Sequence, residues 1–265
     1  MLVLLAIAFV AELIDSSLGM MYGTLLTPVM IASGFEPLVV IPAVLFSQSL
    51  GGIVASFFHH RFCNADFGLQ AGASPRQMES SVAALKNRLT KDIKVVLIIS
   101  SFGVIATVIG ALTALNLPKW LLRGYIGALV AVMGIIVIVE VKWNFSWGKI
   151  TAVGLLSAFN KGISGGGFGP LVTSGQIIAG NEPRSSVAAT TLAEAPICIA
   201  GFLTYLIAGK GISWVVIIPL SLGAVAAAPL GAYLTSKLRG KFLKKSVGAL
   251  SLILGLFMLL TSVPA

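Results

Sequence analysis

The chain contains apolar stretches long enough to cross a lipid bilayer, and two of the longest are each interrupted by a glycine-rich segment. The first, residues 1–33, is broken over residues 15–24, and the second, residues 147–180, is broken over residues 160–170. Hydrophobic residues make up 57% of the chain and charged residues only 10%, whereas a soluble domain carries about 25% charge. We therefore expect an integral membrane protein with lipid as its solvent.

The two breaks restrict the fold further. Backbone that leaves a helix at membrane depth is tolerated only where protein or a water-filled cavity surrounds it, and glycine permits tight turns and close approach of a ligand. Beyond each break a short helix begins, with Thr24 or Pro170 near its first turn. The free N–H groups and the positive dipole end of such a helix favour a bound anion. The breaks predict a protein-lined interior with an anion site.

The chain looks like a tandem duplication. Eight apolar stretches can be drawn, each near the length of about twenty residues that spans the hydrocarbon core. They are residues 1–33, 37–59, 92–115, 118–140, 147–180, 183–209, 212–236 and 242–263. A shift of about 146 residues superimposes Gly19 on Gly165 and Gly23 on Gly169. This symmetry is typical of transporters, and it predicts repeats at 1–140 and 147–265 that form one transport domain.

The charge distribution indicates how the repeats are oriented. Basic residues gather in two connections, residues 60–94 and 237–245, and such loops face the cytoplasm. Both can do so only if the first and fifth stretches do not each cross once, for example as hairpins that enter and leave on one side. The prediction is an all-α protein of the cell membrane, built from two inverted four-element repeats. Each repeat holds a broken or re-entrant hairpin and three transmembrane helices.

The net charge of +9 does not indicate a nucleic-acid partner, because the basic residues lie in short connections without interleaved aromatic residues. Cys63 and Cys198 lie far apart in the sequence and fit neither a disulfide framework nor a metal site. We expect no metal, no cofactor and no nucleic acid. The expected partners are the bilayer, a small anion and protons, and the sequence leaves a homodimer open.

Ionisable and hydrogen-bonding residues beside the breaks are the candidate site, because a charge at membrane depth costs several kcal/mol and is a functional hypothesis by default. Lys161 would balance the charge of the anion. The other anion-binding candidates are Ser16, Ser17, Gly19, Gly23, Asn160, Ser164, Gly165, Gly166, Gly167, Gly169, Thr190 and Thr191. The candidates for coupling to protons are Glu12, Asp15, Gln48 and Glu194.

Structural interpretations of the same residues stay open. Glycines in membrane helices often serve only close packing. Asp15 and Lys161 could pair with each other as structure alone, and Gln48 and Glu194 could form inter-helical hydrogen bonds. His59 and His60 end the second apolar stretch beside a basic residue, where we expect an interfacial position.

The residues around both breaks resemble the signatures of the TauE/SafE sulfite exporter family. The segments concerned are residues 15–28, 165–173, 180–184 and 188–190, together with the corner at 60–64. The resemblance covers nearly the whole chain. It implies a transporter of small sulfur-containing anions, sulfite or an organosulfonate, acting as an exporter by alternating access.

Two other functional classes share some of these features. The string Gly162 to Gly165 matches the Gly-x-Ser-Gly of rhomboid intramembrane proteases, but that chemistry needs a histidine base on a later helix, and no histidine follows His60. A passive anion channel would use the same helix-end electrostatics, and coupling of flux to a proton gradient would distinguish it from a transporter.

Overall fold

The computed structural model describes residues 1–67, 91–139, 147–178 and 181–237, together with short helical pieces between residues 252 and 260. Its described part is helical, without strands. The basic residues at 238–245 and most of the eighth apolar stretch lie outside the described residues, as do most of the 60–94 connection and Gly180. Four helices are long and apolar enough to cross a membrane, which supports the expected membrane protein.

The first half contains α1 (Leu2–Leu18), α2 (Tyr22–Ala32), α3 (Pro37–Arg61), α5 (Lys91–Asn116) and α6 (Lys119–Val139). The second half contains α7 (Trp147–Ser164), α8 (Phe168–Ile178), α9 (Pro183–Ile207) and α10 (Trp214–Thr235). The ends of these helices agree with the apolar stretches drawn from the sequence. Both long stretches are broken where the glycines predicted.

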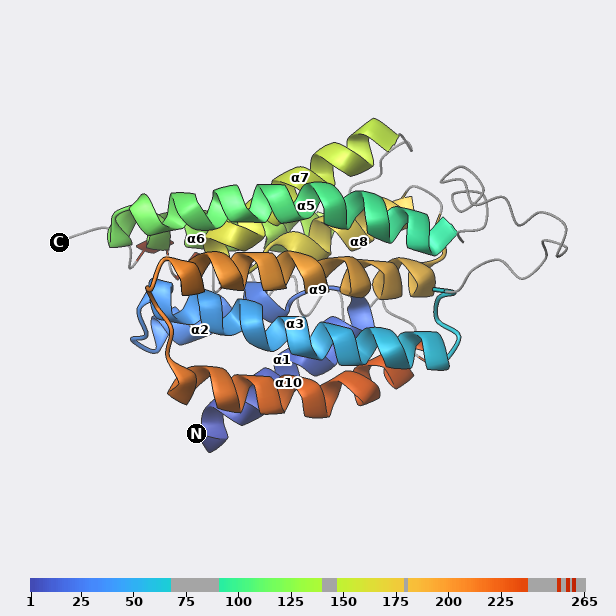
Figure 1. The fold of residues 1–265 in the computed structure, drawn as a ribbon, viewed down its shortest axis with the longest axis horizontal. Coiled ribbons are helices and arrows are strands. Elements are labelled where there is room, and N and C mark those ends of the chain that lie inside the picture. Colours follow the sequence, from blue (N-terminus) through green and yellow to red (C-terminus); the bar gives the residue numbers. More distant parts are fainter. Residues whose placement is uncertain are drawn as a thin grey trace, which may run out of the picture.

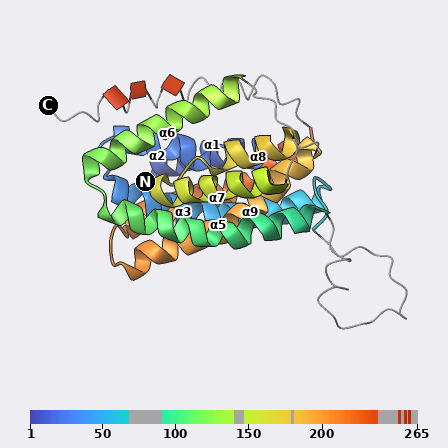
Figure 2. The ribbon, with the colours of Figure 1, turned by 90° about the horizontal axis from the view of Figure 1, so that it is seen from above.

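The long helices lie side by side along one direction (Figures 1 and 2). In Figure 1, α3 and α10 run from left to right, whereas α5 and α9 run from right to left. The α1–α2 pair opens toward the left end of the molecule, and the α7–α8 pair opens toward the right end. Each broken stretch therefore folds back on itself as a hairpin.

Proline starts two of the long helices. Pro37 and Pro183 each occupy the first turn of their helix, where the missing N–H would have no partner within the helix. The first break is made by two residues with positive φ, Gly19 at 68° and Met21 at 107°. The second is made by Gly165 at 73° and Gly167 at 83°. Glycine adopts this backbone region without steric cost, which explains its place at three of these four positions.

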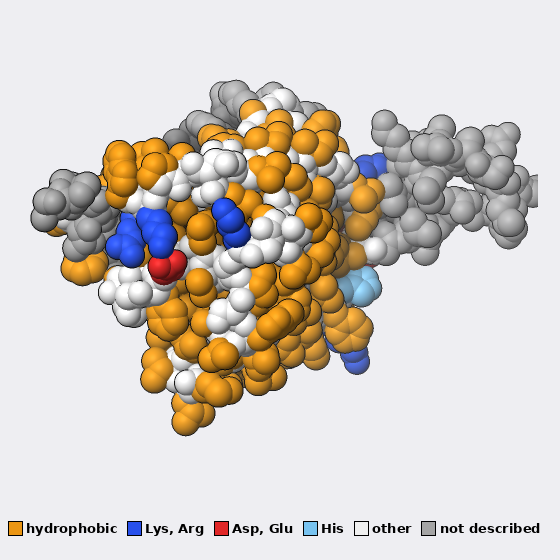
Figure 3. All heavy atoms as spheres, turned by 60° about the vertical axis from the view of Figure 1, so that its left-hand side comes forward, with side chains coloured by type: hydrophobic (Ala, Val, Ile, Leu, Met, Phe, Trp, Pro, Cys, Tyr) orange, Lys and Arg blue, Asp and Glu red, His pale blue; other side chains and the backbone are white. Residues whose placement is uncertain are grey.

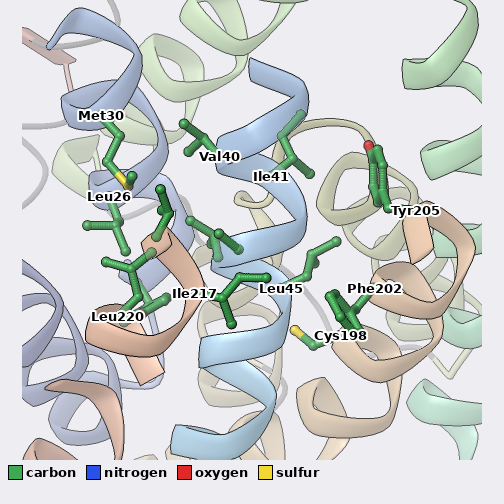
Figure 4. Close-up of a cluster of buried hydrophobic side chains, with 14 of the residues drawn as sticks. Leu26, Met30, Val40, Ile41, Leu45, Cys198, Phe202, Tyr205, Ile217 and Leu220 are labelled. Atoms are coloured by element: carbon green, nitrogen blue, oxygen red, sulfur yellow. The ribbon is translucent and has the colours of Figure 1, made fainter. Parts of the chain in front are cut away.

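The apolar core lies between α2, α3, α9 and α10, where Leu45, Cys198 and Phe202 pack together (Figure 4). Large apolar side chains also cover the outside of the molecule (Figure 3). Phe57 is 67% exposed, and Val215 is 73% exposed. A soluble monomer rarely exposes apolar patches of this extent, so these faces suit contact with lipid chains.

Candidate functional site

The two breaks lie against each other with almost no space between their backbones. A Cβ atom added at Gly23 would lie 1.7 Å from the carbonyl oxygen of Gly165. A Cβ atom added at Gly169 would lie 2.5 Å from the carbonyl oxygen of Gly19. Glycine is required at Gly23 and Gly169 because any side chain would push the two hairpin turns apart. The candidate glycines from the two halves are therefore in one place.

Hydrogen bonds cross from one break to the other. The backbone N–H of Gly167 donates to Thr24 Oγ1 over 3.0 Å. The hydroxyl of Thr173 donates to the carbonyl oxygen of Gly19 over 2.6 Å. These bonds satisfy backbone groups that the breaks leave without helical partners, as burial requires. They fasten the two hairpins to each other in this conformation.

The start of α2 is occupied by a carboxylate of the chain itself. The backbone N–H of Tyr22 donates to Asp15 Oδ1 over 2.9 Å, so Asp15 supplies the negative charge that a helix N-terminus favours. In the second break, the N–H of Gly166 donates to Ser164 Oγ over 3.1 Å. Ser164 thus supports the turn through its hydroxyl. An external anion at the start of α2 would compete with Asp15.

A continuous line of buried polar side chains runs through the middle of the molecule. Gln48 Nε2 donates to Asp15 Oδ2 over 3.3 Å. The amide oxygen of the same Gln48 accepts a hydrogen bond from Lys161 Nζ. Lys161 Nζ also forms an ion pair with Glu194 Oε1 at 2.8 Å. The line Asp15–Gln48–Lys161–Glu194, here called the polar line, joins α1, α3, α7 and α9.

The polar line shows how these four side chains pair. Among the described residues no direct hydrogen bond or ion pair joins Asp15 to Lys161, and the amide of Gln48 bonds to both. Gln48 and Glu194 do form inter-helical contacts, and both bond to Lys161. Lys161 is only 1% exposed and Glu194 only 4%. The positive charge of Lys161 is fully engaged by groups of the chain.

The contacts between the halves are reciprocal under the shift of 146 residues. Within the halves, the bond between Asp15 and Gln48 in the first corresponds to the pair of Lys161 with Glu194 in the second. Between the halves, Gly23 lies against Gly165, and the equivalent residues, Gly169 and Gly19, also lie against each other. The two glycine breaks therefore contact each other through equivalent positions.

The remaining candidates divide into two groups. Asn160 and Ser16 use their side chains near the breaks, since Asn160 Oδ1 accepts from the Tyr125 hydroxyl and Ser16 Oγ donates to Glu12 over 2.6 Å. Thr190 accepts from Thr173 over 3.0 Å and so lies behind the break. Ser17 and Thr191 donate to carbonyl groups of their own helices, and their recorded bonds do not link them to the polar line.

Sequence reasoning missed two groups of residues that complete the site. Thr24 and Thr173 fasten the hairpins together, and the repeat shift could have drawn attention to Thr173 because it falls on Thr27. Tyr22 and Tyr125 donate to Ser47 and Asn160, for which the sequence carries no signal. His59 lies in the last turn of α3 beside the exposed His60 and Arg61, but its own side chain is fully buried.

An exposed ion pair lies away from the site, at one end of the molecule. Lys119 Nζ lies 2.7 Å from Glu36 Oε1, between the start of α6 and the residue before α3. The hydrogen bond from Lys119, followed by its charge, holds the pKa of Glu36 below its usual value. Such exposed pairs add little stability because water and salt screen them.

The sequence is similar to those of known membrane transporters. The family described as Sulfite exporter TauE/SafE matches residues 77–258, more than half of the chain. The chain is also 24% identical over 257 residues to the Probable membrane transporter protein YtnM of Bacillus subtilis (strain 168), which covers 91% of this chain and 77% of the relative. No solved structure matches. Together these findings indicate a membrane transporter and confirm the resemblance: the chain belongs to the TauE/SafE sulfite exporter family.

Proposed function

We propose that this protein transports small sulfur-containing anions, such as sulfite or an organosulfonate, and binds them at Lys161 where the two hairpins meet. The observation that carries the proposal is a lysine with 1% exposure, held at the junction of two helix breaks in a membrane protein. A buried ammonium group is costly, and an apolar residue would pack a purely structural contact at lower cost. An anion-binding role accounts for its presence.

Glu194 occupies the place on Lys161 that the anion would take. Because Glu194 Oε1 lies 2.8 Å from Lys161 Nζ, an anion can bind the ammonium group only when this carboxylate moves away or accepts a proton. Protonation of Glu194 would free Lys161 without leaving a second buried negative charge. Anion and proton would then bind together, and the transport of a monovalent anion would be electrically neutral. Net direction would follow the gradients, which permits export.

Alternating access would follow from the reciprocal contacts. The hairpins open toward opposite ends of the molecule (Figure 1), and equivalent residues exchange contacts at the breaks. These features support two inverted repeats that enclose one site. Rocking of one half against the other would part the hydrogen bonds of Thr24 and Thr173 and open the site to one face at a time.

The contacts of Ser164 favour transport over intramembrane proteolysis. Its hydroxyl donates to the carbonyl oxygen of Asn160 over 2.8 Å, so it bonds within its own hairpin. His59 lies beside the backbone of Ser16 in the other half. The recorded contacts therefore do not pair this serine with the base that such chemistry needs.

Counterflow in proteoliposomes tests the proposal. The purified protein is loaded with unlabelled sulfite, thiosulfate, sulfate, methanesulfonate or acetate, and entry of the same labelled anion is followed. We expect exchange of at least one sulfur anion, abolished by Lys161→Ala. Lys210→Ala is the control because Lys210 is exposed, and it should exchange like the unaltered protein. Exchange that survives Lys161→Ala would remove Lys161 from the site, and flux without counterflow would indicate a channel.

A further inference from the structure

A second group of buried titratable residues, Glu12 and His59, lies beside the polar line. Glu12 is 0% exposed, and its Oε1 accepts a hydrogen bond of 2.6 Å from Ser16. Its other oxygen, Oε2, is buried and makes no hydrogen bond with the part of the chain that the structure describes. A carboxylate in this position would be a buried charge with an unsatisfied oxygen, which is more costly than the neutral acid.

Space for Glu12 is provided by a glycine on the neighbouring helix. A Cβ atom added at Gly51 of α3 would lie 2.8 Å from both Cδ and Oε2 of Glu12. The charged groups that act on Glu12 are Asp15 on its own helix, Glu194 on α9 and Lys161 on α7. Glu12 is therefore next to the polar line and responds to its charges.

On the other side of Ser16 lies His59, which is also 0% exposed. Its Nδ1 lies 3.0 Å from Asn64 Nδ2, and the same amide donates to the carbonyl oxygen of Ala232 over 2.8 Å. Because an amide nitrogen only donates, Nδ1 is the acceptor and the neutral ring carries its proton on Nε2. Nε2 makes no hydrogen bond with the described residues, and the ring lies beside the backbone of Ser16.

His59 is within reach of the aqueous end of the molecule. It lies in the last turn of α3, and the next two residues, His60 and Arg61, are exposed. The groups around it are neutral: Asn64, the α10 backbone at Ala232, and Ser16, whose carbonyl oxygen also accepts from Thr235 over 3.0 Å. The recorded contacts of His59 thus include no charged group that would fix its protonation state.

The other half of the molecule shows that the fold does not need these side chains. The shift of 146 residues places Glu12 on Ala158, Ser16 on Gly162 and His59 on Tyr205. Tyr205 donates to the carbonyl oxygen of Gly162 over 2.9 Å, which is the counterpart of His59 beside Ser16. Ala158 packs in an apolar cluster. Equivalent positions are therefore filled by groups that do not exchange protons near neutral pH.

From these observations we propose that His59, Ser16 and Glu12 form a proton path from the end of α3 to the polar line. His59 takes up a proton from water on Nδ1 as the Asn64 amide turns its unpaired oxygen toward the ring, and it releases the proton on Nε2 to the Ser16 hydroxyl. Ser16 passes its own hydroxyl proton to Glu12, and from Glu12 a proton reaches Glu194 and frees Lys161. The inference rests on the proposed anion transport. Because the path exists in one half only, it serves one face of the membrane.

Glu12→Gln separates this path from the anion site. During counterflow the transporter changes access only with anion bound, and the proton on Glu194 can stay in place while labelled and unlabelled anion exchange, so a residue that only delivers protons is not needed. Labelled anion exchange and anion-driven proton movement, read by a pH-sensitive dye inside the liposomes, are measured on the same preparation. The probe is the anion that exchanges fastest among sulfite, thiosulfate, sulfate and methanesulfonate. Glu12→Gln should keep exchange while its proton movement falls to that of protein-free liposomes.

His59→Gln carries the same test, and Tyr205→Phe in the other half is the matched control that should keep both activities. Proton movement that survives in Glu12→Gln or His59→Gln would overturn the path. The path would also be overturned if Glu12→Gln lost both exchange and proton movement while its Tm equalled that of the unaltered protein, because Glu12 would then belong to the anion site. Absence of exchange in the unaltered protein would instead reject the proposed transport itself.

Discussion

Gly23→Ala should force the two hairpins apart. The new Cβ would lie 1.7 Å from the carbonyl oxygen of Gly165 and 2.6 Å from its carbonyl carbon. Contacts between heavy atoms are comfortable at about 3.5–4.0 Å, so the turns must separate by about 2 Å. Both partners are backbone, and no side-chain rotation can relieve the contact. Overpacking a buried site costs about 1–3 kcal/mol and occasionally more, and we expect at least the upper value here.

Thermal unfolding in detergent measures this effect, with Gly175→Ala as the matched control. Gly175 lies in α8 and would meet no atom within 4 Å, so its replacement should leave Tm unchanged or raise it, because alanine favours a helix by about 0.5–1 kcal/mol. A loss of about 3 kcal/mol corresponds to a fall of roughly 6–12 °C in Tm for a chain of this size. Equal Tm values for the two variants would refute the close contact between the breaks.

Two further predictions concern the buried polar groups. Removing one partner of a buried ion pair costs about 3–5 kcal/mol, whereas replacing both partners by apolar residues is much less harmful. Lys161→Met should therefore lower Tm strongly, and the double variant Lys161→Met with Glu194→Leu should recover most of that loss. A double variant whose Tm falls by the sum of the two single effects would show that the pair contributes nothing. Asp15→Ala removes the acceptor of the Tyr22 N–H and should destabilise the protein by about 1 kcal/mol. Its Tm should be lower than that of Lys210→Ala, the control at an exposed lysine. An unchanged Tm would mean that water replaces this cap.

The apolar stretches and the glycine breaks could be predicted from the sequence because both are local. Helix length follows from the run of apolar residues, and positive φ at Gly19 and Gly165 follows from the residue type. The choice of partners is not local. Lys161 could have paired with Asp15, and only the packing of α9 against α3 and α7 brings Glu194 to it. The burial of His59 is not local either, because it depends on the packing of α3 against α1 and α10.

The reciprocal contacts lead to a prediction about the polar line as a whole. If the halves are equivalent, the line should work when its residues are exchanged between them, by Asp15→Lys, Gln48→Glu, Lys161→Asp and Glu194→Gln together. The lysine introduced at position 15 would pair with the glutamate introduced at position 48, as Lys161 pairs with Glu194 now. The aspartate introduced at position 161 would reach the start of α8, as Asp15 reaches the start of α2.

Counterflow is the measurement that tests this exchange. Lys161→Asp alone leaves several buried carboxyl groups without an ammonium group and should abolish anion exchange. The fourfold variant restores one ammonium group in an equivalent frame, so exchange should return. It should return without coupled proton movement if Glu12 and His59 serve only the original arrangement, because they remain in the first half. If the fourfold variant folds but is as inactive as Lys161→Asp, equivalent contacts in the two halves do not give equivalent function. Lys161 would then depend on neighbouring residues that the first half does not contain.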